Sequence, residues 1–263
     1  MATLSKAPLI EVIFEVRWGK ITPQDNGRTL HISFTDTEKA DLLKNLETES
    51  SKYGFPFVEI ANNLSLETLP PYVPIKRFRP VEGMWPCYQA GVGIFTVNQL
   101  NDGYVWENYA ATVKNGLNLL DTAHPEGISA LAPVALALKY VDGYLLDAGQ
   151  SPTDYIRQNL QVNLDLPGTL LNTGKLGDEV LNPSFGFQLR TQEPVGVADV
   201  SVKTGSINGS PGLISTTTVT SNKDALPDNY CIETITDWTE AAHKLHQIIF
   251  KELPTAAKMK EFE

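Results

Sequence analysis

Hydrophobic and polar residues alternate along the first apolar stretch of the chain, from Leu9 to Trp18. Four apolar side chains fall on one side of this stretch: Ile10, Val12, Phe14 and Val16. Because successive side chains of a strand point to opposite faces, the alternation predicts a strand with one buried face. A nearly continuous apolar run from Val134 to Asp142 predicts a second strand, in the interior of a sheet.

Two longer stretches have apolar residues at a helical period. They run from Val105 to Leu120 and from Asp237 to Leu253, and they predict two amphipathic helices. In the second helix the predicted buried stripe comprises Trp238, Ala241, Ala242, Leu245, Ile248 and Ile249. His243 is expected opposite this stripe and His246 at its edge. Both imidazoles should therefore lie in solvent or at an interface.

Shorter patterns predict the remaining elements. A helix is expected between Thr37 and Tyr53, ended by Gly54, and another after Ser151, where Pro152 favours a helix start. Strands are expected over residues 29–34, 57–60, 75–79, 87–100, 185–193, 195–203 and 212–221. Turn residues predict a tight turn at 101–103, a turn-rich linker at 205–211 and a bulge or close contact at the strand glycines 91 and 93.

The dipeptide Ala-Pro introduces two of the predicted strands, at Ala7-Pro8 and at Ala132-Pro133. Each strand leads to a helix, further strands and a long helix with a tryptophan near its start, Trp106 in one case and Trp238 in the other. This recurrence predicts an α+β fold of two similar β-α-β-β-α halves, with a mostly antiparallel sheet and long amphipathic helices packed on one face. The halves would be residues 1–127 and 128–263, either as two units or within one continuous domain.

The charge balance argues against one class of partner. The chain has 21 Lys and Arg against 31 Asp and Glu, which gives a formal net charge of −10. Because this charge repels a phosphate backbone, we expect no nucleic-acid partner. The sequence also has neither an apolar leader segment nor a run of about 18 apolar residues. We therefore expect no membrane partner and a cytoplasmic location.

Signals for catalysis and for cofactors are weak. Cys87 and Cys231 are far apart and belong to no C-x-x-C motif, so no metal or redox cofactor is predicted. The sequence has no G-x-S-x-G, P-loop or H-E-x-x-H motif, so no catalytic residue is assigned. Glu11 and Glu15 share a strand face with Arg17, and such carboxylates could do acid-base chemistry. A wet sheet face or an ion-pair ladder is the simpler interpretation.

One basic and aromatic cluster is a candidate partner-binding site. Lys76-Arg77-Phe78-Arg79 precedes Trp85. Strand geometry predicts that Arg77 and Arg79 point to the face opposite to Lys76 and Phe78. Because Arg and Trp are enriched at interface hot spots, we predict that Arg77, Arg79 and Trp85 bind a protein partner.

Four segments, taken in order, resemble a known protein family. They are A-P-L-I-E-V-I-F-E-V-R-W near the N-terminus, G-I-F-T-V-N with Y-V-W-E-N-Y-A, the segment L-K-Y-V-D and the terminal A-H-K-L-H-Q-I-I-F-K-E-L. Together they resemble an uncharacterised, sporadically distributed prokaryotic family of similar length. The chain departs from the family's pattern at Asp142, where the resemblance leads us to expect Asn. The family has no established activity, so the resemblance transfers no catalytic residue.

The patchy distribution of this family is similar to that of mobile or defence-associated genes. The resemblance therefore implies an antitoxin-like, immunity-like or chaperone-like binding role. We predict a non-enzymatic protein-binding scaffold that uses exposed sheet edges or an acidic surface, in a homo-oligomer or in a complex with a neighbouring gene product. One alternative is a sensor that binds a small molecule in a cleft between the two halves. An uncharacterised enzyme is the second alternative.

Overall fold

The structure is a computed structural model. It describes residues 7–23, 30–34, 41–61, 70–131, 133–163, 169, 175–176, 180–222, 226 and 231–262. The start of the helix predicted from Thr37 lies outside these residues.

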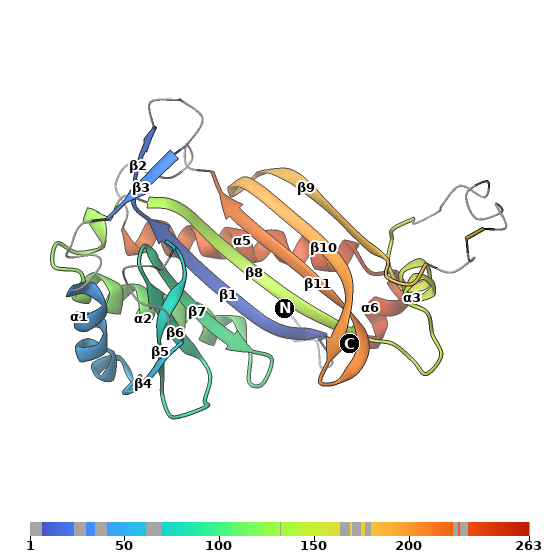
Figure 1. The fold of residues 1–263 in the computed structure, drawn as a ribbon, viewed down its shortest axis with the longest axis horizontal. Coiled ribbons are helices and arrows are strands. Elements are labelled where there is room, and N and C mark those ends of the chain that lie inside the picture. Colours follow the sequence, from blue (N-terminus) through green and yellow to red (C-terminus); the bar gives the residue numbers. More distant parts are fainter. Residues whose placement is uncertain are drawn as a thin grey trace.

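A single antiparallel sheet of nine strands dominates the fold (Figure 1). From one edge to the other its strands are β4 (Phe57–Ile60), β5 (Pro74–Arg79), β6 (Cys87–Gly91), β7 (Ile94–Leu100), β1 (Leu9–Trp18), β8 (Pro133–Leu145), β11 (Ser210–Ser221), β10 (Val195–Ile207) and β9 (Ser184–Gln192). Strands β2 (Lys20–Pro23) and β3 (Leu30–Ser33) form a separate hairpin.

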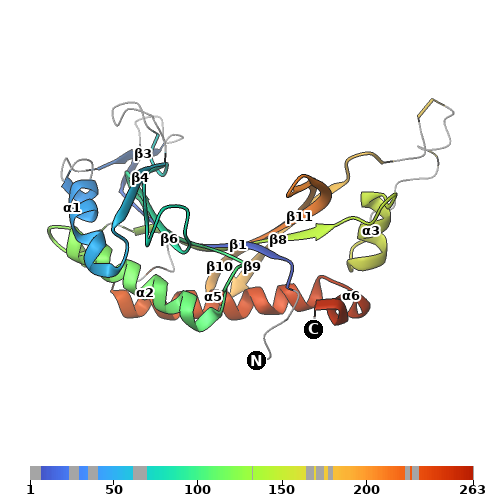
Figure 2. The ribbon, with the colours of Figure 1, turned by 90° about the horizontal axis from the view of Figure 1, so that it is seen from below.

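The long helices cover one face of this sheet. Helices α2 (Trp106–Ala123) and α5 (Ile232–Glu252) run beneath it, and α6 (Ala256–Phe262) follows α5 (Figure 2). The shorter helices are α1 (Leu42–Glu49), which continues into the 3-10 turn η2 (Ser50–Tyr53), the 3-10 turn η3 (Ile128–Ala130) and α3 (Pro152–Asn159). We call the side with α2 and α5 the helix face and the opposite side the open face.

The central strand β1 confirms the predicted alternation. Val12, Phe14 and Val16 are fully buried on the helix face, while Glu11 and its alternate neighbours point to the open face. Ile10 is only half-buried, because the pairing of β1 with β8 shifts register next to it. Burying a side chain of this size contributes roughly 2 kcal/mol. The main core is thus built on β1 against α2.

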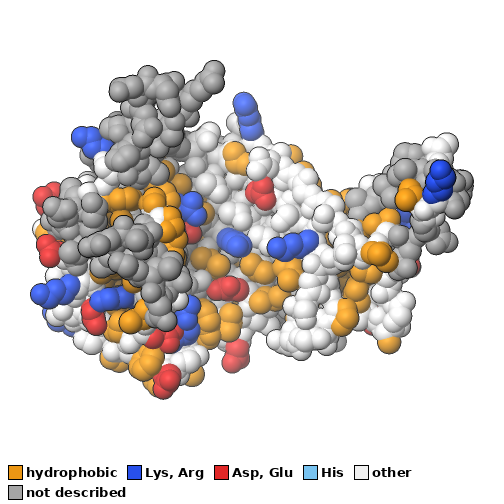
Figure 3. All heavy atoms as spheres, viewed as in Figure 1, with side chains coloured by type: hydrophobic (Ala, Val, Ile, Leu, Met, Phe, Trp, Pro, Cys, Tyr) orange, Lys and Arg blue, Asp and Glu red, His pale blue; other side chains and the backbone are white. Residues whose placement is uncertain are grey.

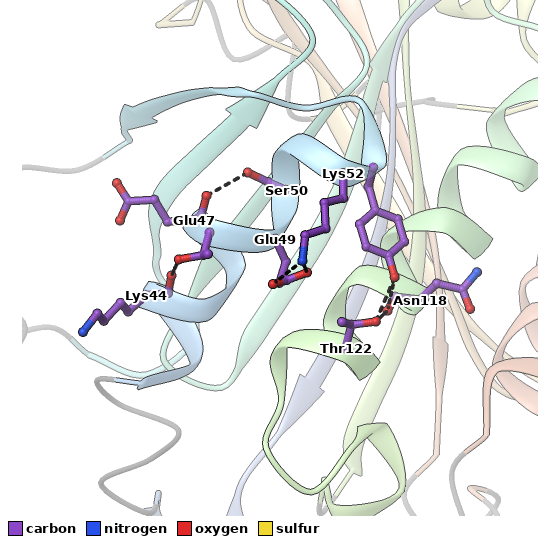
Figure 4. Close-up of polar contacts among 9 residues, drawn as sticks. Lys44, Glu47, Glu49, Ser50, Lys52, Asn118 and Thr122 are labelled. Atoms are coloured by element: carbon purple, nitrogen blue, oxygen red, sulfur yellow. Dashed lines mark hydrogen bonds and ion pairs between the residues drawn. The ribbon is translucent and has the colours of Figure 1, made fainter.

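Helix α1 is held against α2 by side chains as well as by core packing. Leu42, Leu43 and Leu46 are buried in the main core. The Tyr53 hydroxyl lies 2.8 Å from Thr122 Oγ1 and donates to the Asn118 carbonyl at 3.2 Å (Figure 4). The predicted stop at Gly54 is confirmed, since this residue has φ 85°, a left-handed conformation that favours glycine.

The prediction of two similar β-α-β-β-α halves is wrong. Strand β1 pairs directly with β8, so residues from both predicted halves form one sheet. The element order also differs between them, because four strands lie between α1 and α2 but only three between α3 and α5. In addition, α1 packs with the main core, whereas Tyr155 and Ile156 of α3 pack with Phe262 of α6 in a second cluster. The two Ala-Pro dipeptides mark strand starts, which is a local signal that does not report duplication.

Three local predictions also need correction. Gly91-Val92-Gly93 spans the turn that joins β6 to β7, with Gly93 at φ 76°, so the predicted bulge within one strand is wrong. The alternative of a close contact is confirmed, because a Cβ atom at Gly91 would overlap the Val73 carbonyl oxygen. The predicted linker 205–211 is instead the end of a long hairpin, in which Asn208 and Gly209 both have positive φ, as a type I′ turn requires. Helix α5 begins at Ile232, before the predicted Asp237.

Candidate functional site

A polar network crosses the open face from β4 to β1. Glu59 Oε1 accepts a hydrogen bond from Arg77 at 2.9 Å, and Arg77 also donates to Gln89 Oε1 at 3.2 and 3.3 Å. Gln89 donates to Asn98 Oδ1 at 3.0 Å, and Asn98 donates to Glu11 Oε1 at 2.9 Å. Five neighbouring strands are therefore linked by side chains on this face. The network exists because strand pairing places these residues side by side.

The three residues predicted to bind a partner lie together at one end of this network. Arg77 and Arg79 share the open face, as the strand geometry predicted, while Phe78 is buried on the helix face. Arg79 is only 6% exposed and donates to the Met84 carbonyl at 2.7 Å. Its guanidinium also lies 4.6 Å from the centre of the Trp85 ring, a cation–π contact. The cluster is thus preorganised before any partner arrives.

Electrostatics keep this end of the network charged. Hydrogen bonds from Arg79 and Arg77 lower the pKa of Glu59, so its carboxylate stays ionised between the two guanidinium groups. Cys87 lies on the same face but is fully buried, and burial raises the pKa of its thiol to about 12. A thiol that stays protonated at neutral pH is neither a nucleophile nor a metal ligand.

The open face has more cations than carboxylates. Strand registers place on it the cations Arg17, Arg77, Arg79, Lys139, Arg190 and Lys203 and the carboxylates Glu11, Glu15, Glu59 and Asp199. Lys139, Arg190 and Lys203 form no ion pair within the described part of the chain. Figure 3 shows this face, which is hollowed between the β4–β7 end and the tip of the β10–β11 hairpin. Over the strands of the open face as a whole, an overall acidic protein therefore carries more cations than carboxylates.

Residues that the sequence reasoning placed at the surface form a second cluster, inside the helix face. His243 and His246 of α5 are only 6% and 7% exposed, so the prediction that they lie outside the buried stripe is wrong. The Tyr140 hydroxyl lies 2.7 Å from His243 Nδ1, and Gln247 Nε2 lies 2.8 Å from His243 Nε2. The Tyr104 hydroxyl extends this series of hydrogen-bonded side chains, since it lies 3.1 Å from the Tyr140 hydroxyl.

Ring stacking completes this buried cluster. His246 stacks on Tyr140, with ring centroids 3.5 Å apart and planes 11° apart. His246 Nε2 is buried and has no hydrogen-bond partner among the residues that the structure describes. Burial lowers the pKa of His243 to about 4 and that of His246 to about 3, and it raises the pKa of the neighbouring buried Asp142 to about 7. The histidines are therefore neutral at physiological pH.

One sequence signal could have located the histidines. The buried side of α5 consists of Ile235, Thr239, Ala242, His243 and His246. These positions recur every three or four residues, as on any buried helix stripe. The predicted stripe is confirmed in part, since Ala242 is buried and Trp238, Leu245 and Ile249 pack against the two cores. Ile248 within it is 60% exposed, and the two histidines lie beside Ala242 on the inward side.

Comparison with models of protein families, with curated proteins and with solved structures found no match to this chain. No helix among the described residues is long and apolar enough to cross a membrane. Those residues also contain no group of three or more His, Cys, Asp or Glu side chains placed to hold a metal ion.

Proposed function

We propose that this chain is a non-enzymatic protein-binding scaffold that receives an acidic segment of another protein on its open face. The observation that carries the proposal is the excess of cations over carboxylates on that face, in a chain whose net charge is −10. Complementary charge guides association and disfavours wrong partners. The open face differs in sign from the chain as a whole, so it is the surface that attracts an acidic partner.

The hollow has two kinds of group for such a segment. Lys139 is half-buried in the centre of the sheet, and Lys203 is exposed at its side, so two ammonium groups are free to pair with carboxylates. Beside them, alternate residues of β11 provide a row of half-buried hydroxyl groups: Thr216, Thr218 and Thr220. Ammonium and hydroxyl groups together suit a polar, acidic chain better than an apolar one.

The preorganised cluster of Arg77, Arg79 and Trp85 contacts the other end of the acidic segment. Arg77 keeps its guanidinium in place through Glu59 and Gln89, and Trp85 lies at the rim, half-buried over Arg79. Side chains that are already ordered lose little entropy on binding. We assign this cluster the role of an anchor, and Lys139 and Lys203 the role of electrostatic recognition.

The biological setting follows from the family resemblance. An antitoxin-like, immunity-like or chaperone-like scaffold in the cytoplasm uses this open face to hold a neighbouring gene product. The sensor alternative required a cleft between two separate halves. The pairing of β1 with β8 joins those segments in one sheet, so no observation favours that alternative.

Site-specific photo-crosslinking in the native host tests the proposal. A benzophenone side chain is placed at Thr218 on the open face or, as a matched control, at Ala111 on the exposed side of α2. We expect a crosslink to a protein from Thr218 only, with the attachment point in an acidic segment identified by mass spectrometry. A crosslink to nucleic acid, or equal capture from both positions, overturns the proposal.

Charge reversal makes the same test quantitative. Lys139→Glu together with Lys203→Glu should reduce the Thr218 crosslink at least about tenfold, because two favourable pairs become repulsive. Lys44→Glu, which changes an exposed lysine of α1 away from this face, should leave the yield unchanged. Equal yields from the two charge variants would show that the surface around Lys139 and Lys203 does not bind the partner.

A further inference from the structure

The last strand of the sheet lacks the usual protection of an edge. Strand β9 has nine residues, pairs with β10 alone among the described strands and keeps an uninterrupted register along its whole length. It contains no lysine and no proline, and its only charged residue is Arg190. Exposed edges of this kind pair with other strands unless charges, bulges or prolines prevent it. The opposite edge, β4, is only four residues long.

Exposed apolar side chains accompany this free edge. Phe187 and Leu189 lie opposite Val200 and Ala198 of β10, which are buried on the helix face. Yet Phe187 is 39% and Leu189 52% exposed, because the helices cover β10 and stop short of β9. Figure 1 shows β9 as the outermost strand, with no labelled element beyond its outer side. Both main-chain and apolar groups are therefore available to a partner along β9.

We infer that β9 pairs antiparallel with β9 of a second copy of this chain, which gives a twofold dimer with one sheet continuous across both copies. The inference is independent of what binds the open face. If all nine residues of β9 pair with those of the partner's β9, the twofold axis passes beside the central residue, Gln188. Phe187 then lies opposite the partner's Leu189 on the helix face, so each copy covers the apolar side chains of the other.

Charge favours the same arrangement. Two copies with a net charge of −10 repel each other over most of their surfaces, but β9 has no carboxylate. With the axis at Gln188, Arg190 faces the partner's Gly186, which has no side chain, and the two arginines stay apart. The twofold axis is perpendicular to the sheet, so the open faces of both copies lie on the same side of the dimer. Together they form one longer cationic surface.

A register-specific disulfide tests the dimer. In the full-length protein with Cys231→Ser, Gln188→Cys places two thiols across the axis, within reach of each other. Oxidation of this variant should yield a covalent dimer that is visible on a non-reducing gel. The control is Arg190→Cys, two residues away, which should give at least about tenfold less covalent dimer at the same protein concentration. The remaining thiol, Cys87, is fully buried and does not interfere.

A second measurement separates this interface from any other. Light scattering after size exclusion should show a dimer for the unmodified chain, and Leu189→Lys should raise its dissociation constant at least about tenfold. Ile248→Lys is the matched control, since this exposed α5 residue is outside the interface, and it should leave the dimer intact. The inference is overturned if the unmodified chain is a monomer at all concentrations. It is also overturned if Leu189→Lys still forms the dimer and Gln188→Cys gives no covalent dimer. Thermal unfolding confirms that each variant is folded.

Discussion

The imidazole of His243 lies flat on the indole of Trp106, with ring centroids 3.6 Å apart and planes 7° apart. The Trp106 indole N–H donates to the Glu240 carboxylate at 2.7 Å, so two contacts join the start of α2 to α5. The stack covers one side of an imidazole whose edge binds Tyr140. His243 thus joins α2 and α5 to β8 at one point.

Acid should destabilise the protein through the two buried histidines. Their pKa values in the folded state, about 4 and about 3, lie below the ordinary value of 6.5. The stability they contribute is complete above pH 6.5 and is lost as the pH falls towards 4, because the unfolded chain takes up protons that His243 and His246 in the folded chain cannot. From these two groups alone, the free energy of unfolding should fall by about 4 kcal/mol between pH 7 and pH 5, and the buried Asp142 offsets part of this loss.

Urea unfolding at a series of pH values measures this loss. The double variant His243→Gln, His246→Phe removes both groups, so the loss on going from pH 7 to pH 5 should be absent from it. Equal losses in the variant and the unmodified chain would place the acid sensitivity in other residues.

Asp142 should have the opposite pH dependence. Burial raises its pKa from 3.8 to about 7, so its contribution to stability is present below the ordinary pKa and is lost as the pH rises through 7. Asp142→Asn keeps the shape of the side chain and removes the buried charge. We expect the variant to be more stable than the unmodified chain by roughly 4 kcal/mol at pH 8, with a much smaller difference at pH 4.

The exposed Asp147 provides the comparison for this substitution. Asp147→Asn should change the urea midpoint little at either pH. If Asp142→Asn destabilises the protein at pH 8, the carboxylate is stabilised in the folded chain by interactions that outweigh its burial.

Asn98 holds the open-face network together. It is only 4% exposed, accepts hydrogen bonds from Gln89 at 3.0 Å and Thr96 at 2.6 Å, and donates to Glu11. Asn98→Ala leaves these partners unpaired and should lower the free energy of unfolding by about 2 kcal/mol. Thr218→Ala on the same face should cost little, and similar losses in both variants would mean that the network adds nothing to stability.

Gly116 lies where α2 packs tightly against side chains of the sheet. A Cβ atom there would lie 2.9 Å from Tyr88 Cε1 and 3.1 Å from Phe95 Cε1. Alanine favours a helix over glycine by about 1 kcal/mol, but overpacking a core costs roughly 1–3 kcal/mol. We therefore expect Gly116→Ala to lower the thermal midpoint, while Asn115→Ala at the exposed neighbouring position raises it slightly. A higher midpoint in both variants would show that the helix moves away without cost.

Elements defined by local side-chain order could be predicted from the sequence. The strand from Leu9 to Trp18, the helix after Gly103 and the placement of Arg77 and Arg79 on one face depend only on the period of the backbone. A period of two or of 3.6 residues is a property of the segment itself. It does not depend on which strand or helix lies alongside, so these predictions needed no tertiary information.

Strand pairing and the burial of polar groups were decided by tertiary contacts. Similar apolar strands can pair in many orders, and only the folded chain places β1 beside β8. The side of α5 that faces inward depends likewise on Tyr140, far away in the sequence, which stacks on His246 and hydrogen bonds to His243. An imidazole is buried when the sheet supplies a flat ring and a hydroxyl for it, and no helical pattern within α5 contains that information.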